Sequence, residues 1–261
     1  MRLVTVATES QDMFPLLKKA SARLGYDLVV LGWGQTWRGF AWRWSLLKDY
    51  LHTLPPDELV VWCDAYDVLP VAPPAEVKAR YQRLGAPMVM SVEDPEVSPA
   101  EIYLRRRMFG KPCRDNVFIN GGLYMGTAGV LLEMVRVLQD EVGMRDTDDD
   151  QRLMNSLCRT GFMQHVAFDH RSTIFFNAGS FMPWQKTWPG PVDTCFLHFP
   201  GHSYYKAAVE FHGYEAPPQM LTTGYVTRWW NQFSKYMLPE ITVCVALLCF
   251  FMYATKKAAL G

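Results

Sequence analysis

Apolar and amphipathic stretches alternate along the first 92 residues of the chain. The apolar runs are short, rich in valine and leucine, and end at glycine or polar residues, which is typical of buried strands. We expect strands at 3–8, 27–31, 58–63 and 87–92. The stretches between them carry apolar side chains at helical spacing, and we expect helices at 11–24, 43–54 and 74–84. This alternation predicts an α/β fold with a mostly parallel central sheet.

The second half of the chain is patterned less regularly. Residues 117–127 contain two consecutive glycines and predict a strand, a turn and a second strand. Further elements are expected as helices at 129–141 and from the acidic run at 146–150 to about residue 158, and as strands at 163–168 and 194–198. We assign residues 1–213 to one domain and 214–236, rich in proline, glycine and aromatic residues, to a linker. Ligands bind beyond the carboxyl ends of parallel strands, so polar residues there are the candidates for chemistry.

The C-terminal segment differs in composition from the rest of the chain. Residues 241–254 carry no charge, although a spanning helix usually needs roughly 20 residues. Extended to 237–255, with aromatic residues before it and lysines after it, the segment predicts a single-pass membrane anchor followed by a tail at 256–261. The alternative is a hydrophobic helix packed on the domain or on a partner. The N-terminus predicts no signal peptide and so favours a cytosolic-facing domain, with a lumenal ER or Golgi location as the alternative.

Charge and cysteine content narrow the classes of function. Lysine plus arginine and aspartate plus glutamate both number 26, so the net charge is zero and nothing predicts a nucleic-acid partner. The run Arg105-Arg106-Arg107 indicates a solvated face or a substrate-side loop. Of the six cysteines none forms a C-x-x-C pair, and we expect the four outside the C-terminal segment to be inert thiols. A single bridge, Cys113–Cys158 or Cys158–Cys195, is the alternative.

Two clusters of carboxylates stand out as candidates for chemistry. Asp64 and Asp67 directly follow the expected strand 58–63, where they can converge on one Mg²⁺ or Mn²⁺ ion. Such an ion would neutralise the diphosphate of a nucleotide substrate. Turn formation or helix capping is the alternative for these residues. The second cluster places four acids in the five positions 146–150, where they would cap a helix or bind a cation or the hydroxyls of a sugar.

Two further polar motifs follow later in the chain. Asp169-His170-Arg171 is followed by Asn177, and His198 lies at the end of the expected strand 194–198. A histidine at a strand end is commonly a hydrogen-bonded surface residue. His198 can instead supply an imidazole ligand that completes a two-aspartate metal site.

Taken in order, these motifs resemble the glycosyltransferase domain of the procollagen lysyl hydroxylases and its stand-alone and viral relatives, over roughly residues 3–206. The resemblance is carried by Val6-Ala7-Thr8, Leu31 to Gly34, Trp37-Arg38-Gly39, Asp64 to Val68, Ser91-Val92-Glu93, Asn120 to Gly126, Asp148 to Gln151, Asp169-His170-Arg171 with Asn177, and His198 with Gly201. The chain departs from the family pattern at Arg43, where the family has lysine, and at Pro200, where it has asparagine.

The resemblance implies a GT-A type nucleotide-sugar transferase in residues 1–213. By this resemblance Mn²⁺, or another divalent cation, binds to Asp64, Asp67 and His198. The donor binds at Tyr66, which stacks on uracil, at Trp37, which lies over the donor, and at Thr8, Arg43, Gly201 and Lys206. Asp149, Asp150 and Asn120 contact the sugar or support its transfer.

The resulting hypothesis is a hexosyltransferase that moves glucose or galactose from a UDP-sugar to a hydroxyl of a protein-linked glycan or a hydroxylysine-type residue. Two alternatives stay open on the sequence. One is a non-catalytic nucleotide-sugar-binding module of a membrane complex, and the other is a nucleotide-sugar hydrolase.

Overall fold

The structure of the protein is a computed structural model. It describes residues 1–93, 99–145, 148–178, 188, 190, 191, 193–200, 206–216 and 242. The expected anchor at 237–255 therefore lies, except for Thr242, outside the described residues, as does most of the expected linker. In the part of the chain that is described, no helix is long and apolar enough to span a bilayer.

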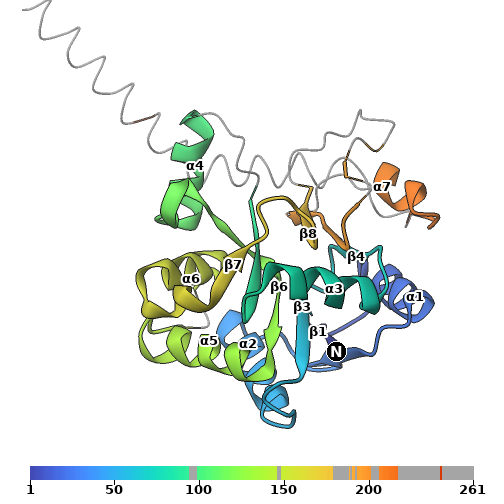
Figure 1. Ribbon diagram of the computed structural model, residues 1–261, viewed down its shortest axis with the longest axis horizontal. Coiled ribbons are helices and arrows are strands. Elements are labelled where there is room, and N and C mark those ends of the chain that lie inside the picture. The colour runs from blue at the N-terminus through green and yellow to red at the C-terminus, as the bar shows by residue number, and fades with distance from the viewer. Residues whose placement is uncertain are drawn as a thin grey trace, which may run out of the picture.

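A six-stranded sheet forms the centre of the domain (Figure 1). Its strands stand in the order β2 (Leu28–Leu31), β1 (Arg2–Val6), β3 (Leu59–Cys63), β6 (Ile119–Thr127), β5 (Met88–Val92) and β7 (Val166–Phe168). β6 is antiparallel to both of its neighbours, and every other pair of adjacent strands is parallel. The sheet is therefore mixed, with one reversed strand, and the α/β class expected from the sequence is confirmed.

A smaller sheet begins where β3 ends. It contains β4 (Val68–Pro70), β9 (Phe196–His198) and β8 (Phe175–Asn177), in that order. Only four residues separate β3 from β4, so the small sheet stands at the carboxyl end of a central strand of the large one. This is the edge at which α/β sheets bind ligands.

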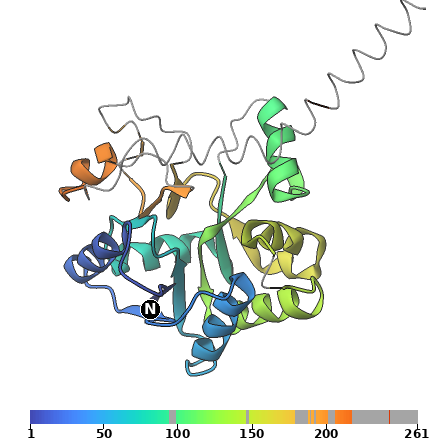
Figure 2. The same cartoon turned by 180° about the vertical axis from the view of Figure 1, so that it is seen from behind.

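Helices cover both faces of the large sheet (Figures 1 and 2). α1 (Phe14–Leu24) and α3 (Pro74–Leu84) pack on one face, and α2 (Phe40–Leu51), α5 (Ala128–Asp140) and α6 (Asp150–Ser156) on the other. Side chains alternate along each strand, so Val61 faces α1 and α3 whereas its neighbour Trp62 faces α2 and α5. The remaining helices within the described residues are α4 (Pro99–Phe109), α7 (Lys206–Phe211) and three short 3₁₀ turns at Arg114–Asn116, Leu157–Arg159 and Gly161–His165.

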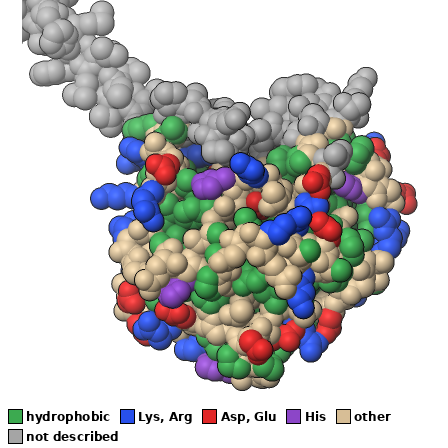
Figure 3. Space-filling model, viewed as in Figure 1, with side chains coloured by type: hydrophobic (Ala, Val, Ile, Leu, Met, Phe, Trp, Pro, Cys, Tyr) green, Lys and Arg blue, Asp and Glu red, His purple; other side chains and the backbone are tan. Residues whose placement is uncertain are grey.

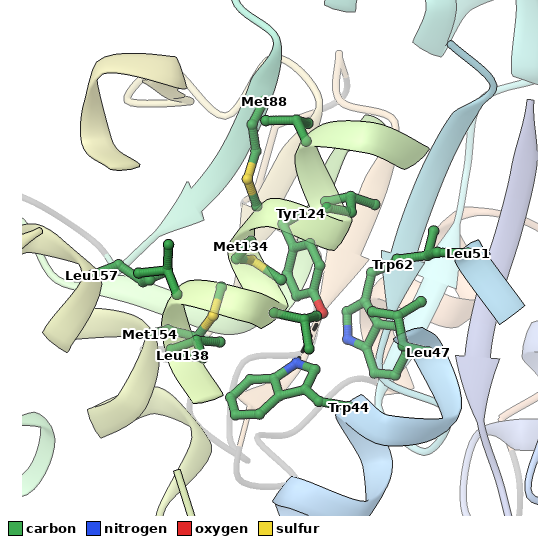
Figure 4. Packing of buried hydrophobic residues seen from close by; sticks show 14 of the residues in the cluster. Trp44, Leu47, Leu51, Trp62, Met88, Tyr124, Met134, Leu138, Met154 and Leu157 are labelled. Atoms are coloured by element: carbon green, nitrogen blue, oxygen red, sulfur yellow. Dashed lines mark hydrogen bonds between the residues drawn. The ribbon is translucent and has the colours of Figure 1, made fainter. Parts of the chain in front are cut away.

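Large aromatic side chains fill the core between the sheet and α2 (Figure 4). Trp62 of β3 stacks on Tyr124 of β6, with ring centroids 5.8 Å apart, and Trp44 of α2 donates a hydrogen bond from Nε1 to the Tyr124 hydroxyl over 3.2 Å. All three side chains are fully buried. Because the buried polar atoms of Trp44 and Tyr124 satisfy each other, this core fixes the position of α2 against β3 and β6.

The strand–turn–strand prediction for residues 117–127 is wrong. β6 runs without interruption through Asn120, Gly121 and Gly122. A Cβ atom at Gly122 would lie 2.4 Å from Cε1 of His198, so glycine is needed there for close packing and not for a turn. The short strands β4 and β8 and the helix α4 had no clear sequence pattern and were not predicted.

One disulfide bond links two distant segments. Cys113, in the connection after α4, is bonded to Cys158, just after α6, with their Cα atoms 5.1 Å apart. The expectation of inert thiols is wrong for these two residues, and the Cys113–Cys158 alternative is correct. Cys63 and Cys195 are free and buried, as expected.

Candidate active site

The metal-ligating residues predicted from the sequence converge at the junction of the two sheets. Asp64 and Asp67 lie in the turn between β3 and β4, and His198 ends β9. β4 pairs with β9 so that Val68 stands opposite His198, which brings the imidazole next to the turn. One ligand atom from each of Asp64, Asp67 and His198 lies within 4.8 Å of the other two. Two carboxylates and an imidazole in this arrangement suit a divalent cation such as Mn²⁺.

Asn177 holds the imidazole of His198 in place. β8 and β9 are parallel and pair Asn177 with His198. Asn177 Oδ1 lies 2.7 Å from His198 Nδ1, and Asn177 Nδ2 donates to the carbonyl of Val92 over 2.7 Å. Because the amide nitrogen is committed to a carbonyl, Oδ1 accepts from the imidazole, so Nδ1 carries the proton. Nε2, which lies 3.4 Å from Asp67 Oδ1, is then free to ligate a metal.

The charges at this junction favour a bound cation. Burial raises the pKa of Asp64 to about 6, against the opposing effect of Arg43, and the neighbouring carboxylates of Asp67 and Asp150 raise it further. Burial lowers the pKa of His198, but the carboxylates of Asp67, Asp64 and Glu93 together outweigh burial and raise the pKa. Asp67 Oδ1 is buried and has no hydrogen-bond partner among the described residues. A divalent cation would relieve the repulsion and satisfy this oxygen, so the residues present fit a metal.

Arg43 of α2 joins the two acidic clusters of the sequence. Its side chain is only 6% exposed, with Nη1 2.8 Å from Asp64 Oδ1 and Nη2 2.8 Å from Asp150 Oδ2. The guanidinium also lies over the rings of Phe40, Trp44 and Trp62. Burial opposes its charge, yet Asp64 and Asp150 more than compensate and raise its pKa. Arg43 is therefore a permanent buried cation between the expected metal ligands and α6.

The second acidic cluster does not act as a unit. Asp148 accepts from the backbone N–H of Arg145 over 2.8 Å and faces its guanidinium, whereas Asp149 caps α6 by accepting from the backbone N–H of Arg152 over 2.9 Å. Of the three acids described, only Asp150 reaches toward the metal ligands, through Arg43. Helix capping therefore accounts for Asp149. Asp146 lies outside the described residues.

An open cavity of about 380 Å³ lies beside the three converging residues. Its walls include Asp64 and Asp67 together with four residues expected to bind the donor, namely Thr8, Trp37, Arg43 and Tyr66. The Tyr66 hydroxyl accepts from the backbone N–H of Thr8 over 3.0 Å, which fixes the tyrosine ring in the wall. Trp37 is 46% exposed and packs edge-on against Phe40 and Trp42.

Other predicted site residues lie away from the cavity walls. Asn120 is buried, and its amide accepts from the backbone of Gly122 and donates to Glu93, so it supports β6 behind the metal ligands. Lys206 is exposed at the start of α7, 3.8 Å from Glu210. Gly201 lies outside the described residues.

Asp169 has a structural role. It is almost fully buried, and its carboxylate accepts hydrogen bonds from the backbones of Thr173, Ile174 and Phe175 and from the Thr173 hydroxyl. Asp169 thereby orders the loop that leads into β8. The residue that this motif contributes to the site is Asn177, which the sequence analysis named without assigning it a role.

The fold thus places an Asp-Asp-His group beside an open cavity at the carboxyl edge of an α/β sheet. The chain belongs to the PLOD GT domain family, whose family model matches residues 1–182. This confirms the resemblance seen in the sequence.

The similar curated proteins are all much longer than this chain. Procollagen-lysine,2-oxoglutarate 5-dioxygenase 1 of Gallus gallus is 27% identical over 191 residues, which covers 67% of this chain and 25% of the relative. Multifunctional procollagen lysine hydroxylase and glycosyltransferase LH3 of Rattus norvegicus and of Homo sapiens are each 26% identical over 191 residues. The chain thus spans about a quarter of the length of the curated relatives it matches.

Among solved structures, this chain is similar to the following one. It is a glycosyltransferase involved in the glycosylation of the major capsid of PBCV-1, with 13% identity and a TM-score of 0.49 over 77% of this chain and 92% of that one.

Proposed function

We propose that this chain is a GT-A type, metal-dependent hexosyltransferase that uses a UDP-sugar, with glucose or galactose as the transferred sugar. The acceptor is a hydroxyl on a protein-linked glycan or on a hydroxylysine-type residue. The observation that carries the proposal is the convergence of Asp64, Asp67 and His198, because the two aspartates of this group line an open cavity.

The metal ligands have the chemistry that a diphosphate donor requires. Asp64, Asp67 and His198 would hold Mn²⁺ or another divalent cation, which supplies positive charge against the diphosphate when bound. Asn177 keeps the Nε2 lone pair of His198 directed at the same point as the carboxylates. Arg43 stands in the same cavity wall and adds a fixed positive charge on the donor side.

The cavity walls provide contacts for the rest of the donor. The fixed ring of Tyr66 offers a face for the uracil, and the exposed indole of Trp37 can cover the bound nucleotide. Asp150, next to Arg43, is the carboxylate best placed to accept from sugar hydroxyls and to stabilise positive charge at the anomeric carbon. Asn120, Gly201 and Lys206 remain predicted contacts, whereas we give Asp149, the cap of α6, no contact with the donor.

One observation favours an enzyme over a binding module. The carboxylate of Asp150 lies 2.8 Å from the guanidinium of a buried arginine, next to the expected metal ligands, and is only 16% exposed. Such a placement costs desolvation and contributes little to holding a nucleotide. It is useful when charge develops in a transition state.

The disulfide bond is informative about the cellular compartment in which the protein folds. Disulfides form and persist in oxidising compartments and are rare in the cytosol. The Cys113–Cys158 bond therefore favours an extracytosolic compartment, such as the secretory lumen, over the expected cytosolic-facing domain. Attachment to a membrane through 237–255 remains a prediction.

A donor screen tests the proposed function. UDP-glucose, UDP-galactose and GDP-sugars are each incubated with the full chain and Mn²⁺, and release of nucleoside diphosphate is measured with and without hydroxylysine and galactosyl-hydroxylysine. We expect release from a UDP-hexose that increases with an acceptor and stops in excess chelator. Release that no acceptor increases would identify a hydrolase, binding without release would identify a binding module, and full activity in chelator would refute the metal site.

A further inference from the structure

A second cavity, of about 360 Å³, lies between the end of α4, the turn at 142–145 and α6. Successive residues at the start of α6 serve the two cavities: Asp149 lines this one, whereas Asp150 reaches Arg43 in the wall of the donor cavity. A ligand in the second cavity would therefore lie close to the proposed site of transfer. Nothing in the proposed donor binding uses this cavity.

Positive charge predominates in the walls of the second cavity. Four cationic residues line it, against two carboxylates among the described residues: Lys111, Arg145, Arg152 and Arg159. Figure 3 shows lysine and arginine side chains on the side of the molecule where α4 and α6 lie. Both carboxylates are already engaged, since Asp148 faces Arg145 and Asp149 caps α6.

The two remaining arginines of the cavity wall donate hydrogen bonds to neutral groups. Arg152 donates from Nε and Nη2 to the backbone carbonyls of Met108 and Arg107, and Arg159 donates to the Ser156 hydroxyl. Neither Lys111 nor Arg159 has a carboxylate partner within the described residues. Neutral partners leave the charge of these groups uncompensated, so the cavity attracts an anion.

The disulfide bond joins two segments that each contribute a cation to the wall of this cavity. Lys111 stands two residues before Cys113, and Arg159 directly follows Cys158. Because the Cα atoms of the two cysteines are 5.1 Å apart, the bond keeps these two unpaired cations near each other although they are far apart in the sequence. Holding the cations together before a ligand arrives lowers the entropy lost on binding.

We propose that this cavity binds the acidic group of an anionic acceptor sugar, either a carboxylate or a phosphate. The proposal rests on the proposed transferase function, because it gives the acceptor a place beside Asp150. Arginine and lysine are the residues that bind such oxyanions most strongly, and the volume is at the small end for ligand sites, which suits one sugar residue. The basic run Arg105–Arg107 then belongs to the substrate side, since the Arg107 carbonyl holds Arg152.

Binding of acidic and neutral sugars tests this proposal. The full chain, in excess chelator so that no metal draws phosphate into the donor cavity, is titrated by calorimetry with galactose 6-phosphate, glucuronate and galactose. We expect one or both acidic sugars to bind, more weakly as salt is added, and galactose not to bind. The two acidic probes separate a phosphate ligand from a carboxylate ligand. Equal binding of galactose, or no binding of either acidic sugar, would overturn the proposal.

Substitutions in the cavity wall test whether the acidic sugar binds in this cavity. Lys111→Gln combined with Arg159→Gln removes the two unpaired charges from exposed positions, and should weaken binding of the acidic sugar about tenfold or more. Arg83→Gln, at an exposed arginine of α3, should change nothing. Reducing the disulfide should also weaken binding while the protein stays folded by circular dichroism. Unchanged affinity in the double variant would overturn the proposal, whereas UDP release in the donor screen would be unaffected by its failure.

Discussion

The two acidic clusters of this chain look alike in the sequence and differ in the structure. Asp64 and Asp67 stand in a turn between two strands, and β9 brings His198 against them, so three elements direct their side chains at one point. The acids at 148–150 stand at the start of a helix, where successive side chains point in different directions, and each takes a separate partner. Density of charge in a sequence therefore indicates a site less well than the kind of element that carries it.

The largest expected effect comes from breaking the first cluster. Asp67→Ala removes an expected ligand whose Oδ1 has no hydrogen-bond partner among the described residues. Mn²⁺-dependent release of UDP should therefore fall on the order of 10³-fold or more, as several kcal/mol of charge stabilisation are lost. Mn²⁺ binding, measured by calorimetry, should be lost with it. Activity near that of the wild type in a folded Asp67→Ala protein would remove Asp67 from the site.

The second cluster gives a sharper test, because it contains its own control. Asp150→Asn keeps the shape and removes the charge beside Arg43, and should lower turnover on the order of 10²-fold while UDP affinity changes little. Asp149→Asn should keep nearly full turnover, since asparagine caps a helix as well as aspartate does. If both variants lose turnover equally, the division within this cluster is wrong.

The hydrogen bond from His198 to Asn177, which orients the imidazole of the first cluster, can be tested by substitution of Asn177. Asn177→Leu removes the acceptor for His198 Nδ1, so the imidazole loses its fixed orientation, and Mn²⁺ affinity should fall about 10- to 100-fold. Saturating Mn²⁺ should restore much of the lost turnover. This result would show that Asn177 positions the histidine and takes no direct part in transfer. Equal Mn²⁺ affinity in the variant and the wild type would show that β8 does not orient the histidine.

The smallest effect is expected at the cap of α6. Asp149→Ala removes the side chain that accepts from the Arg152 N–H and should lower the free energy of unfolding by about 1 kcal/mol. Turnover of the folded fraction should stay nearly normal. Melting temperature and turnover measured on the same sample distinguish this outcome from a direct catalytic role, in which turnover would fall and stability would not.

The regular first part of the domain could be predicted from the sequence, because local pattern determines it. The helix at Pro74–Leu84 has the predicted bounds, and the first strands and helices agree within a few residues. The three expected metal ligands also lie close together as predicted, although for His198 the family motif, and not the spacing, singled it out among six histidines.

The features that were predicted wrongly or not at all share a physical cause, which is contact between residues far apart in the chain. The glycines of β6 were interpreted as a turn because the crowding of Gly122 by His198 cannot be seen from neighbours in sequence. β4 and β8 have three residues each and are stable only through pairing with β9. Likewise the pairing of Cys113 with Cys158 and the orienting role of Asn177 follow from tertiary structure that no short motif specifies.

The buried position of Arg43 bears on how the domain responds to loss of metal. With its guanidinium between Asp64 and Asp150, the protein carries a built-in counter-ion at the place where repulsion between carboxylates would otherwise push the strands and α6 apart. Unlike a zinc finger, which unfolds when its metal is removed, this domain should keep its shape in chelator. Changes in the concentration of free metal would then raise or lower the activity reversibly, while the amount of folded protein stays the same.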